Sequence, residues 1–225
     1  MNIIKYNNKD YKVFCENNKQ CTPFHNDLFM MSIILNDLDK SDIFIETGSF
    51  LGNTIYFVGA NFENLKCYTC ELQQKYFNIT QKKVKDMLNV TAMFVKSPDA
   101  LYKISEDIDI FNKKVCFWLD AHWKTDPLNQ EIKYITKNFK NYTIYIDDFV
   151  IPWNKNFTND GFTIEKIKPF ITNKNKISCY MPNYSHRLPE CNNINNCRLQ
   201  PRGYCILTTD MANYDNISLL KKVDL

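Results

Sequence analysis

From Asp42 onward, short apolar segments alternate with stretches of helical periodicity, and this alternation constrains the fold more than any other feature. Seven segments are predicted to be strands: Ile43–Glu46, Cys67–Glu71, Ala92–Val95, Val115–Leu119, Thr143–Ile146, Ile177–Tyr180 and Tyr204–Thr208. Four intervening segments are predicted to be helices: Asn53–Phe62, Gln74–Leu88, Pro98–Glu106 and Pro127–Asn138. Strands that alternate with helices predict an α/β fold whose mostly parallel sheet is covered on both faces.

The residues before Asp42 follow different patterns. Residues 1–14 are predicted to form a hairpin around Asn7-Asn8-Lys9, and Thr22 with Pro23 resembles a helix start. The helix that follows should bury one apolar face, because five apolar residues recur at spacings of four and three: Phe24, Leu28, Met31, Leu35 and Leu38. We therefore expect one domain over 1–225, with an N-terminal extension (1–40), a core (41–152) and a C-terminal part (153–225).

Composition excludes several classes of protein. The chain has 225 residues, of which 44% are hydrophobic and 24% charged, so it has enough apolar residues for a packed core and is not a disordered chain. No apolar run approaches the ~18 residues of a membrane span, and the first residues are rich in Asn and Lys, so a cytoplasmic location without a membrane partner is expected. The net charge of +3 comes from interspersed signs, so no nucleic-acid partner is expected.

The turn after the first strand is rich in glycine although the whole chain has only five glycines. It is Glu46-Thr47-Gly48-Ser49-Phe50-Leu51-Gly52-Asn53-Thr54. Glycines at the carboxyl end of a parallel strand let backbone N–H groups approach a ligand, and ligands of open α/β sheets bind at that edge. The spacing fits neither a dinucleotide site nor a P-loop. Taken alone, the turn could equally be structural.

Acidic residues follow four strands of the predicted sheet. Glu46 and Glu71 end the first two strands, Asp120 follows the fourth, and Asp147-Asp148 follow the fifth. Because the carboxyl ends of parallel strands lie at one edge, these carboxylates should gather there. Clustered carboxylates cost free energy unless they are paired or bind a cation, so stability alone does not explain them.

Together these segments resemble the class I S-adenosylmethionine-dependent methyltransferases. The resemblance spans residues 41–152 and rests on Glu46-Thr47-Gly48-x3-Gly52, Glu71, Ser97-Pro98-Asp99, Leu119-Asp120-Ala121-His122 and Ile146-Asp147-Asp148. It implies a Rossmann-like, doubly wound sheet of seven strands that closes with an antiparallel C-terminal hairpin. It also implies S-adenosylmethionine as the cofactor.

The same resemblance assigns cofactor roles to individual residues. Glu46 would face the methionine end, Glu71 would bind the ribose hydroxyls, and Ser97 with Pro98 would flank the adenine. The remaining cofactor-binding residues would be Thr47, Gly48, Ser49, Gly52, Asn53, Thr54, Leu72 and Asp120. Family members often carry an acidic residue where this chain has Lys96, and Asp99 is not an obvious substitute.

The chemistry of methyl transfer suggests a general base at the fourth strand end. The transfer is an in-line displacement that needs orientation, and a hydroxyl acceptor must also lose its proton. His122 follows Asp120 closely, and an imidazole has a suitable pKa, although a structural histidine is the alternative.

An alternative hypothesis is that the acidic residues bind a metal ion. In metal-dependent O-methyltransferases of the same superfamily, residues at the positions of Asp120, Asp147 and Asp148 hold a divalent cation, and three oxygen ligands would suit Mg²⁺. Those enzymes usually have a lysine where this chain has Trp123. Without a metal, Asp120 and Asp147 would position the acceptor and His122 directly. The candidate catalytic residues are Asp120, His122, Asp147 and Asp148.

The connection between the last two predicted strands, residues 181–203, is long enough to suggest a substrate loop. It contains all three arginines of the chain, and guanidinium groups suit phosphate or carboxylate. We predict six substrate-contacting residues: Trp123, Tyr184, His186, Arg187, Arg198 and Arg202. The acceptor would then be a small anionic metabolite such as a sugar, a nucleotide-linked sugar or a phosphate-bearing compound. Methylation of nucleic acid and a non-catalytic role stay as alternatives.

Overall fold

The computed structural model describes residues 2–6, 9–13, 15–16, 19–20, 23–106, 108–121, 127–155, 157, 161–184 and 203–225. Its main feature is an eight-stranded sheet with the order β12-β10-β11-β9-β8-β5-β6-β7. The strands are β5 (Ile43–Thr47), β6 (Lys66–Glu71), β7 (Val90–Phe94), β8 (Lys114–Leu119), β9 (Asn141–Ile146), β10 (Ser178–Pro182), β11 (Cys205–Thr208) and β12 (Leu220–Val223).

Strand directions confirm the mostly parallel sheet. Strands β5, β6, β7, β8 and β9 run parallel, whereas β11 is antiparallel to both β9 and β10. All seven sequence-predicted strands are present. The prediction of seven strands was nevertheless wrong by one, because β12 pairs with β10 at the edge. Its Leu-Lys-Lys-Val sequence has too few apolar residues to be recognised from the sequence alone.

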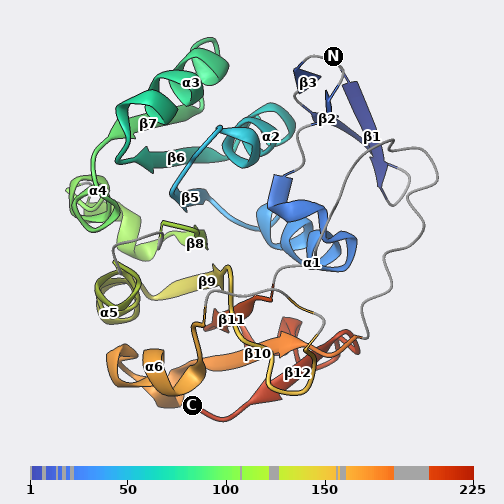
Figure 1. Ribbon diagram of the computed structural model, residues 1–225. Helices are drawn as coiled ribbons and strands as arrows, with labels where there is room; N and C mark the ends of the chain where they lie inside the picture. Colours follow the sequence, from blue (N-terminus) through green and yellow to red (C-terminus); the bar gives the residue numbers. More distant parts are fainter. Residues whose placement is uncertain are drawn as a thin grey trace.

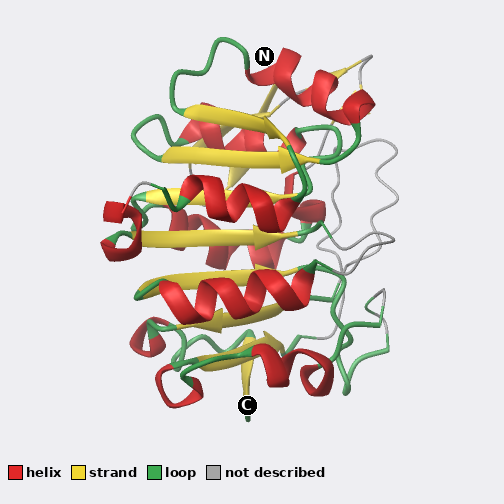
Figure 2. Ribbon diagram, turned by 90° about the vertical axis from the view of Figure 1, so that its left-hand side faces the viewer, coloured by secondary structure: helices red, strands yellow, loops and turns green. Residues whose placement is uncertain are grey.

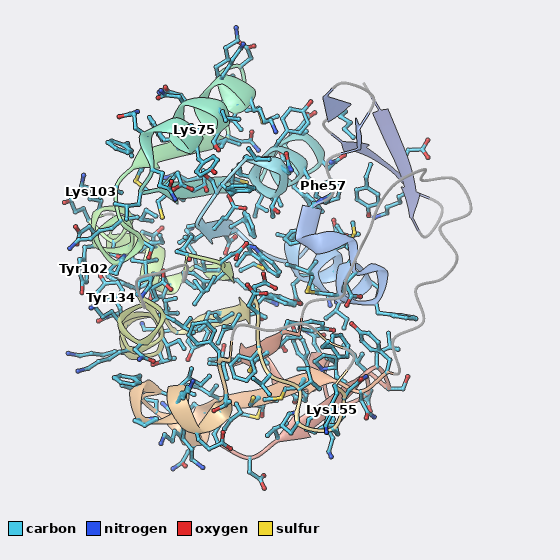
Figure 3. The ribbon with its side chains drawn as sticks, in the orientation of Figure 1. Phe57, Lys75, Tyr102, Lys103, Tyr134 and Lys155 are labelled. Atoms are coloured by element: carbon cyan, nitrogen blue, oxygen red, sulfur yellow. The ribbon has the colours of Figure 1, made fainter. Side chains whose placement is uncertain are left out.

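Helices cover both faces of the sheet. They are α1 (Leu28–Leu38), α2 (Asn53–Asn61), α3 (Gln74–Val84), α4 (Ser97–Ile104), α5 (Leu128–Asn138) and α6 (Ile164–Ile167). Figure 1 shows α4, α5 and α6 on one side of the sheet and α1 and α2 on the other. Figure 2 shows the strands stacked between these helical layers. Tyr102 of α4 and Tyr134 of α5 bring two neighbouring helices together with ring centroids 4.7 Å apart (Figure 3).

The central strands have no polar face because both of their faces are buried in the core. Val115, Cys116, Phe117, Trp118 and Leu119 of β8 are all at most 1% exposed, as expected for a strand covered on both sides. None of the described helices combines the length and the apolar character that a membrane crossing requires.

The N-terminal extension forms small elements beside the sheet. These are β1 (Asn2–Tyr6), β2 (Lys9–Val13), β3 (Cys15–Glu16), β4 (Lys19–Gln20) and the 3₁₀ helix η1 (Pro23–Asn26). The predicted hairpin is present as β1–β2. Helix α1 starts later than the Thr22-Pro23 signal suggested, because the Asp27 carboxylate caps it by accepting the N–H groups of Phe29 and Met30. Thr22 lies outside the described residues.

The other short helices complete the chain between strands. They are η2 (Ile108–Asn112), η3 (Lys168–Phe170), η4 (Lys174–Lys176) and η5 (Met211–Asn213). The carboxyl ends of β6, β5, β8 and β9 lie next to one another at one edge of the sheet. That edge carries the residues singled out from the sequence.

Candidate active site

The glycine turn after β5 brings two loops into contact. Gly48 has a φ of +84°, and a Cβ at this position would lie 2.5 Å from the backbone oxygen of Asp120. Its N–H and that of Ser49 donate to the Cys70 carbonyl at 3.1 and 3.0 Å. Only glycine combines this φ with this close approach, so the residue fixes the distance between the β5 and β8 loops.

The second glycine of the turn sets the start of α2. Gly52 has a φ of +70° at the helix N-cap, and a Cβ there would lie 2.7 Å from the Thr80 hydroxyl of α3. That hydroxyl lies 3.1 Å from Ser49 Oγ and donates to the Phe50 carbonyl at 3.2 Å. The turn therefore packs on α3 through Thr80.

Glu71 holds the same turn from the neighbouring strand. Its side chain is buried, and its two carboxylate oxygens accept the N–H of Phe50 at 2.9 Å and the N–H of Gln73 at 2.8 Å. Phe50 has a φ of +46°, which a bulky residue rarely adopts, and its ring lies against Tyr76 with centroids 4.5 Å apart. A carboxylate has about four acceptor positions, so Glu71 can still accept from two vicinal hydroxyls.

Glu46 is a buried carboxyl group one strand away. It is 2% exposed and accepts a hydrogen bond from Thr69 Oγ1 at 2.6 Å. Burial, with a smaller contribution from the negative charge of Glu71, raises its pKa to about 8, against the hydrogen bond from Thr69. A cationic group placed beside Glu46 would favour its ionised form.

Three aspartates converge after β8 and β9. Carboxylate oxygens of Asp120, Asp147 and Asp148 all lie within 4.8 Å of one another. Asp147 and Asp148 are buried, and Asp148 has a φ of +53°. Close, buried carboxylates cost free energy, which hydrogen bonds, a cation or a proton can offset, and backbone strain of this kind is enriched at functional sites.

Comparisons with known proteins agree with the α/β fold. The sequence model of the family described as "Histone methylation protein DOT1" matches residues 5–115, slightly less than half of the chain. An O-methyltransferase from Bacillus cereus, solved with SAH, has a TM-score of 0.54 at 13% identity, over 82% of each chain. The chain has the fold of the class I S-adenosylmethionine-dependent methyltransferases.

Two further solved structures show how widely this methyltransferase fold is used. TomG from Streptomyces achromogenes, an O-methyltransferase of tomaymycin synthesis solved with SAM, has a TM-score of 0.51 at 11% identity, covering 80% of this chain and 78% of that one. A candidate rRNA methylase from Clostridium thermocellum has a TM-score of 0.50 at 16% identity, covering 79% and 94%. No curated protein matches the sequence.

Two buried hydroxyls at this edge of the sheet have no hydrogen-bond partner among the described residues. They are Thr47 Oγ1 at the end of β5 and Ser97 Oγ at the start of α4. Orphaned buried polar atoms are costly, so they suit a place where a ligand completes the hydrogen bonding. Pro98 is buried beside Ser97, whereas Lys96 is exposed and pairs with Asp99 at 3.6 Å.

Other predicted cofactor residues have different surroundings. Leu72 is 57% exposed next to Glu71. Asn53 accepts from Lys83 Nζ at 2.6 Å, and Thr54 Oγ1 accepts the N–H of Phe24 at 3.4 Å. These two side chains therefore join the start of α2 to α3 and to η1.

Most of the predicted substrate residues, and the predicted base, lie outside the described residues. They are His122, Trp123, His186, Arg187, Arg198 and Arg202. Tyr184 is described and is buried, with its hydroxyl 2.5 Å from Asp27 Oδ2 and 3.2 Å from the Tyr204 hydroxyl.

Sequence reasoning missed the contribution of Asp27 and Tyr204 to this region. The Tyr184 hydroxyl bonds Asp27, the residue that caps α1, and also contacts the Tyr204 hydroxyl on the other side of the connection between β10 and β11. Asp27 precedes an apolar helix, which is a recognisable N-cap signal, but nothing in the sequence indicates its tyrosine partners.

Proposed function

We propose that the methyltransferase transfers a methyl group to an oxygen of a small anionic acceptor. The observation that carries this proposal is the group of Asp120, Asp147 and Asp148 carboxylates, which lie within 4.8 Å of one another beside the glycine turn. A cofactor held at that turn would present its methyl group towards these carboxylates, because Gly48 packs directly on the backbone of Asp120.

The aspartate group fits a divalent cation. It offers only oxygen donors, two of its three members are buried, and the negative charges need compensation. Asp120, Asp147 and Asp148 would hold Mg²⁺. The ion would supply Lewis acidity that lowers the pKa of an acceptor hydroxyl.

The protein's own residues would do the remaining work by orientation. Glu71 would accept the ribose hydroxyls, and the orphaned Ser97 hydroxyl would bond the adenine that Pro98 contacts. Glu46 would face the ammonium of the methionine part, which would ionise its carboxyl group. Holding donor and acceptor in line supplies most of the rate gain in such a displacement.

Proton removal and acceptor selection would fall to residues outside the described ranges. His122 would take the acceptor proton, with Asp120 nearby in the sequence. Arg187, Arg198 and Arg202 would pair with the anionic group of the acceptor.

A macromolecular acceptor is the second candidate. The matched family model is described by histone methylation, and one of the solved structures is a candidate rRNA methylase. The balanced charge of the chain favours the small acceptor.

The proposal is tested with tritium-labelled S-adenosylmethionine. The enzyme is incubated with hydroxy acids, sugar phosphates and nucleotide sugars, and in parallel with total RNA and with histones. We expect label in the small-molecule fraction, dependent on Mg²⁺ and lost on chelation. Label only in RNA or protein would overturn the acceptor class, and activity that survives exhaustive chelation would overturn the metal.

Two variants assign the roles within that assay. Asp147→Asn should lower turnover at least about 100-fold with unchanged cofactor affinity, whereas the exposed Asp224→Asn should have no effect. His122→Ala should lower turnover by about 10²–10⁴-fold, and undiminished turnover would show that another group accepts the proton.

A further inference from the structure

The two edges of the eight-stranded sheet differ in how they are protected. Edge strand β12 has two adjacent exposed lysines, Lys221 and Lys222, which discourage another strand from pairing there. The opposite edge is β7, with the sequence Val-Thr-Ala-Met-Phe. It has no charge, proline or glycine, so β7 has none of these usual devices against strand pairing.

The free side of β7 is identified by its bonds to β6. The Asn89 carbonyl accepts from Cys67 N–H at 2.8 Å, and Val95 N–H donates to the Glu71 carbonyl at 3.2 Å. Main-chain groups alternate in direction along a strand, so odd-numbered residues from Asn89 to Val95 face β6. The N–H and C=O groups of Ala92 and Phe94, and the C=O of Val90, therefore point away from the sheet.

This edge is complementary to itself. A two-fold axis at Ala92, perpendicular to the sheet, would bring two β7 strands together in antiparallel register. Ala92 would then face Ala92 of the second copy, and Val90 would face Phe94. The outward N–H groups of Ala92 and Phe94 would meet the outward carbonyls of Ala92 and Val90, because antiparallel hydrogen-bonded pairs recur every second residue.

The side chains suit the same arrangement. Phe94 is 49% exposed and packs on Phe77 of α3 with ring centroids 5.4 Å apart. Pairing would place Phe94 opposite the β-branched Val90, a stabilising cross-strand pair, with the small Ala92 at the axis. No like charges would meet along the strand, because β7 carries none.

We propose that β7 is a dimerisation edge on which two copies of this chain join their sheets by an antiparallel β7–β7 pair. The edge is closed and isologous, as in most homodimers, so pairing stops at two copies. The inference does not depend on the methyl acceptor or on a metal.

The test uses Thr91, an exposed residue in the middle of β7. In the proposed register the two Thr91 side chains are diagonal neighbours on one face, about 7 Å apart. Sedimentation velocity of the full chain at about 1–200 µM should show a monomer–dimer equilibrium in the micromolar range expected of a small interface. Thr91→Lys and Thr91→Glu should each raise the dimer dissociation constant at least tenfold.

A mixture of the two variants supplies the decisive comparison. Lysine on one copy and glutamate on the other form an attractive diagonal pair, so the equimolar mixture should recover most of the lost dimer. Gln81→Lys, which adds the same charge on the exposed side of α3, should leave dimerisation unchanged. Circular dichroism and thermal unfolding of each variant confirm that it is folded.

Three results would overturn the proposal. They are a wild-type chain that stays monomeric over the whole concentration range, Thr91 variants that dimerise as the wild type does, and a mixture that dimerises no better than either variant alone. If the mixture dimerises no better than either variant, the antiparallel β7–β7 pair centred on Ala92 is excluded, even if the β7 edge binds some other strand.

Discussion

The two halves of the sheet's carboxyl edge are built on different principles. At β5 and β6 the two carboxyl groups accept hydrogen bonds from the protein: Glu71 accepts two backbone N–H groups, and Glu46 accepts the Thr69 hydroxyl. At β8 and β9 three aspartates crowd together, and two of them are buried. The backbone of the first half is therefore held by hydrogen bonds within the protein, whereas a cation or protons would offset the repulsion between the carboxylates of the second half.

With the proposed function, this difference would give the two halves different parts in the reaction. Pre-organised backbone geometry suits a cofactor that must be held in one pose, because little ordering cost remains when it binds. Clustered carboxylates suit the acceptor side, where charge changes during the transfer. The following variants would break or sharpen the contrast, beginning with the largest expected effect.

Gly48→Ala should damage the cofactor half most. Its Cβ would lie 2.5 Å from the Asp120 backbone oxygen at a φ of +84°. We expect a loss of about 2–4 kcal/mol in the free energy of unfolding and at least a 100-fold loss of S-adenosylmethionine affinity. Denaturant unfolding and calorimetry measure the two effects.

Gly161→Ala is the matched control for that variant. Gly161 also has a positive φ, +88°, but the nearest atom to its Cβ position is Lys166 Nζ, at 3.9 Å. Gly161→Ala should lower the free energy of unfolding because of its positive φ, but it should not lower the affinity for S-adenosylmethionine. Equal effects of the two variants would mean that the contact between the β5 and β8 loops is unimportant.

Glu71→Ala should weaken cofactor binding about 10–100-fold. The change removes the acceptor of the Phe50 and Gln73 N–H groups together with the proposed ribose contact. Glu63→Ala, at an exposed salt bridge with Lys12, should leave affinity unchanged. Calorimetry of the two variants checks this, and an unchanged dissociation constant for Glu71→Ala would remove the ribose assignment.

Glu46→Gln should change how stability depends on pH. Because the folded-state pKa of about 8 exceeds the usual 4.5, the folded protein holds a proton that the unfolded chain releases. This contribution to stability is present below about pH 4.5 and is lost as the pH rises to about 8, by on the order of 1 kcal/mol per pH unit. Glutamine accepts the same hydrogen bond without a charge, so the variant should lack this slope. Denaturant unfolding from pH 5 to 8.5 measures the free energy of unfolding of both proteins. If this free energy changes with pH equally in the two proteins, the claim that burial raises the pKa of Glu46 is contradicted.

Asp147→Asn should give the smallest change in the free energy of unfolding, and in the opposite direction. Removing one of three close charges should stabilise the metal-free protein by roughly 0.5–1 kcal/mol, while a Mg²⁺-dependent rise in the melting temperature should disappear. Thermal unfolding with and without Mg²⁺ measures both. A variant that Mg²⁺ still stabilises as much as the wild type would place the ion elsewhere.

Much of the fold could be predicted from the sequence because local pattern and burial agree. β8 is apolar throughout because it is buried on both faces, and its apolar run is visible in the sequence. The edge strand β12 escaped prediction because it is half exposed and carries two lysines. The start of α1 was misplaced because a proline signal at Pro23 belongs to a 3₁₀ turn, and the true cap, Asp27, follows it.

The candidate site was predictable where it depends on strand ends. Glu46, Glu71, Asp120 and Asp147 were expected at one edge from their place after parallel strands, and the structure puts them there. The strained backbone of Phe50 and the hydrogen bonds of Tyr184 to Asp27 and Tyr204 were not foreseen. These features arise from contacts between residues distant in the chain, which no local pattern records.

The most direct test of the account is calorimetric titration of the wild-type chain with S-adenosylmethionine. We expect one cofactor per chain with a dissociation constant of about 1–100 µM, and a marked loss of affinity in Gly48→Ala. A folded chain that takes up no cofactor at millimolar concentration would contradict the assignment of this sheet edge as a methyl-donor site.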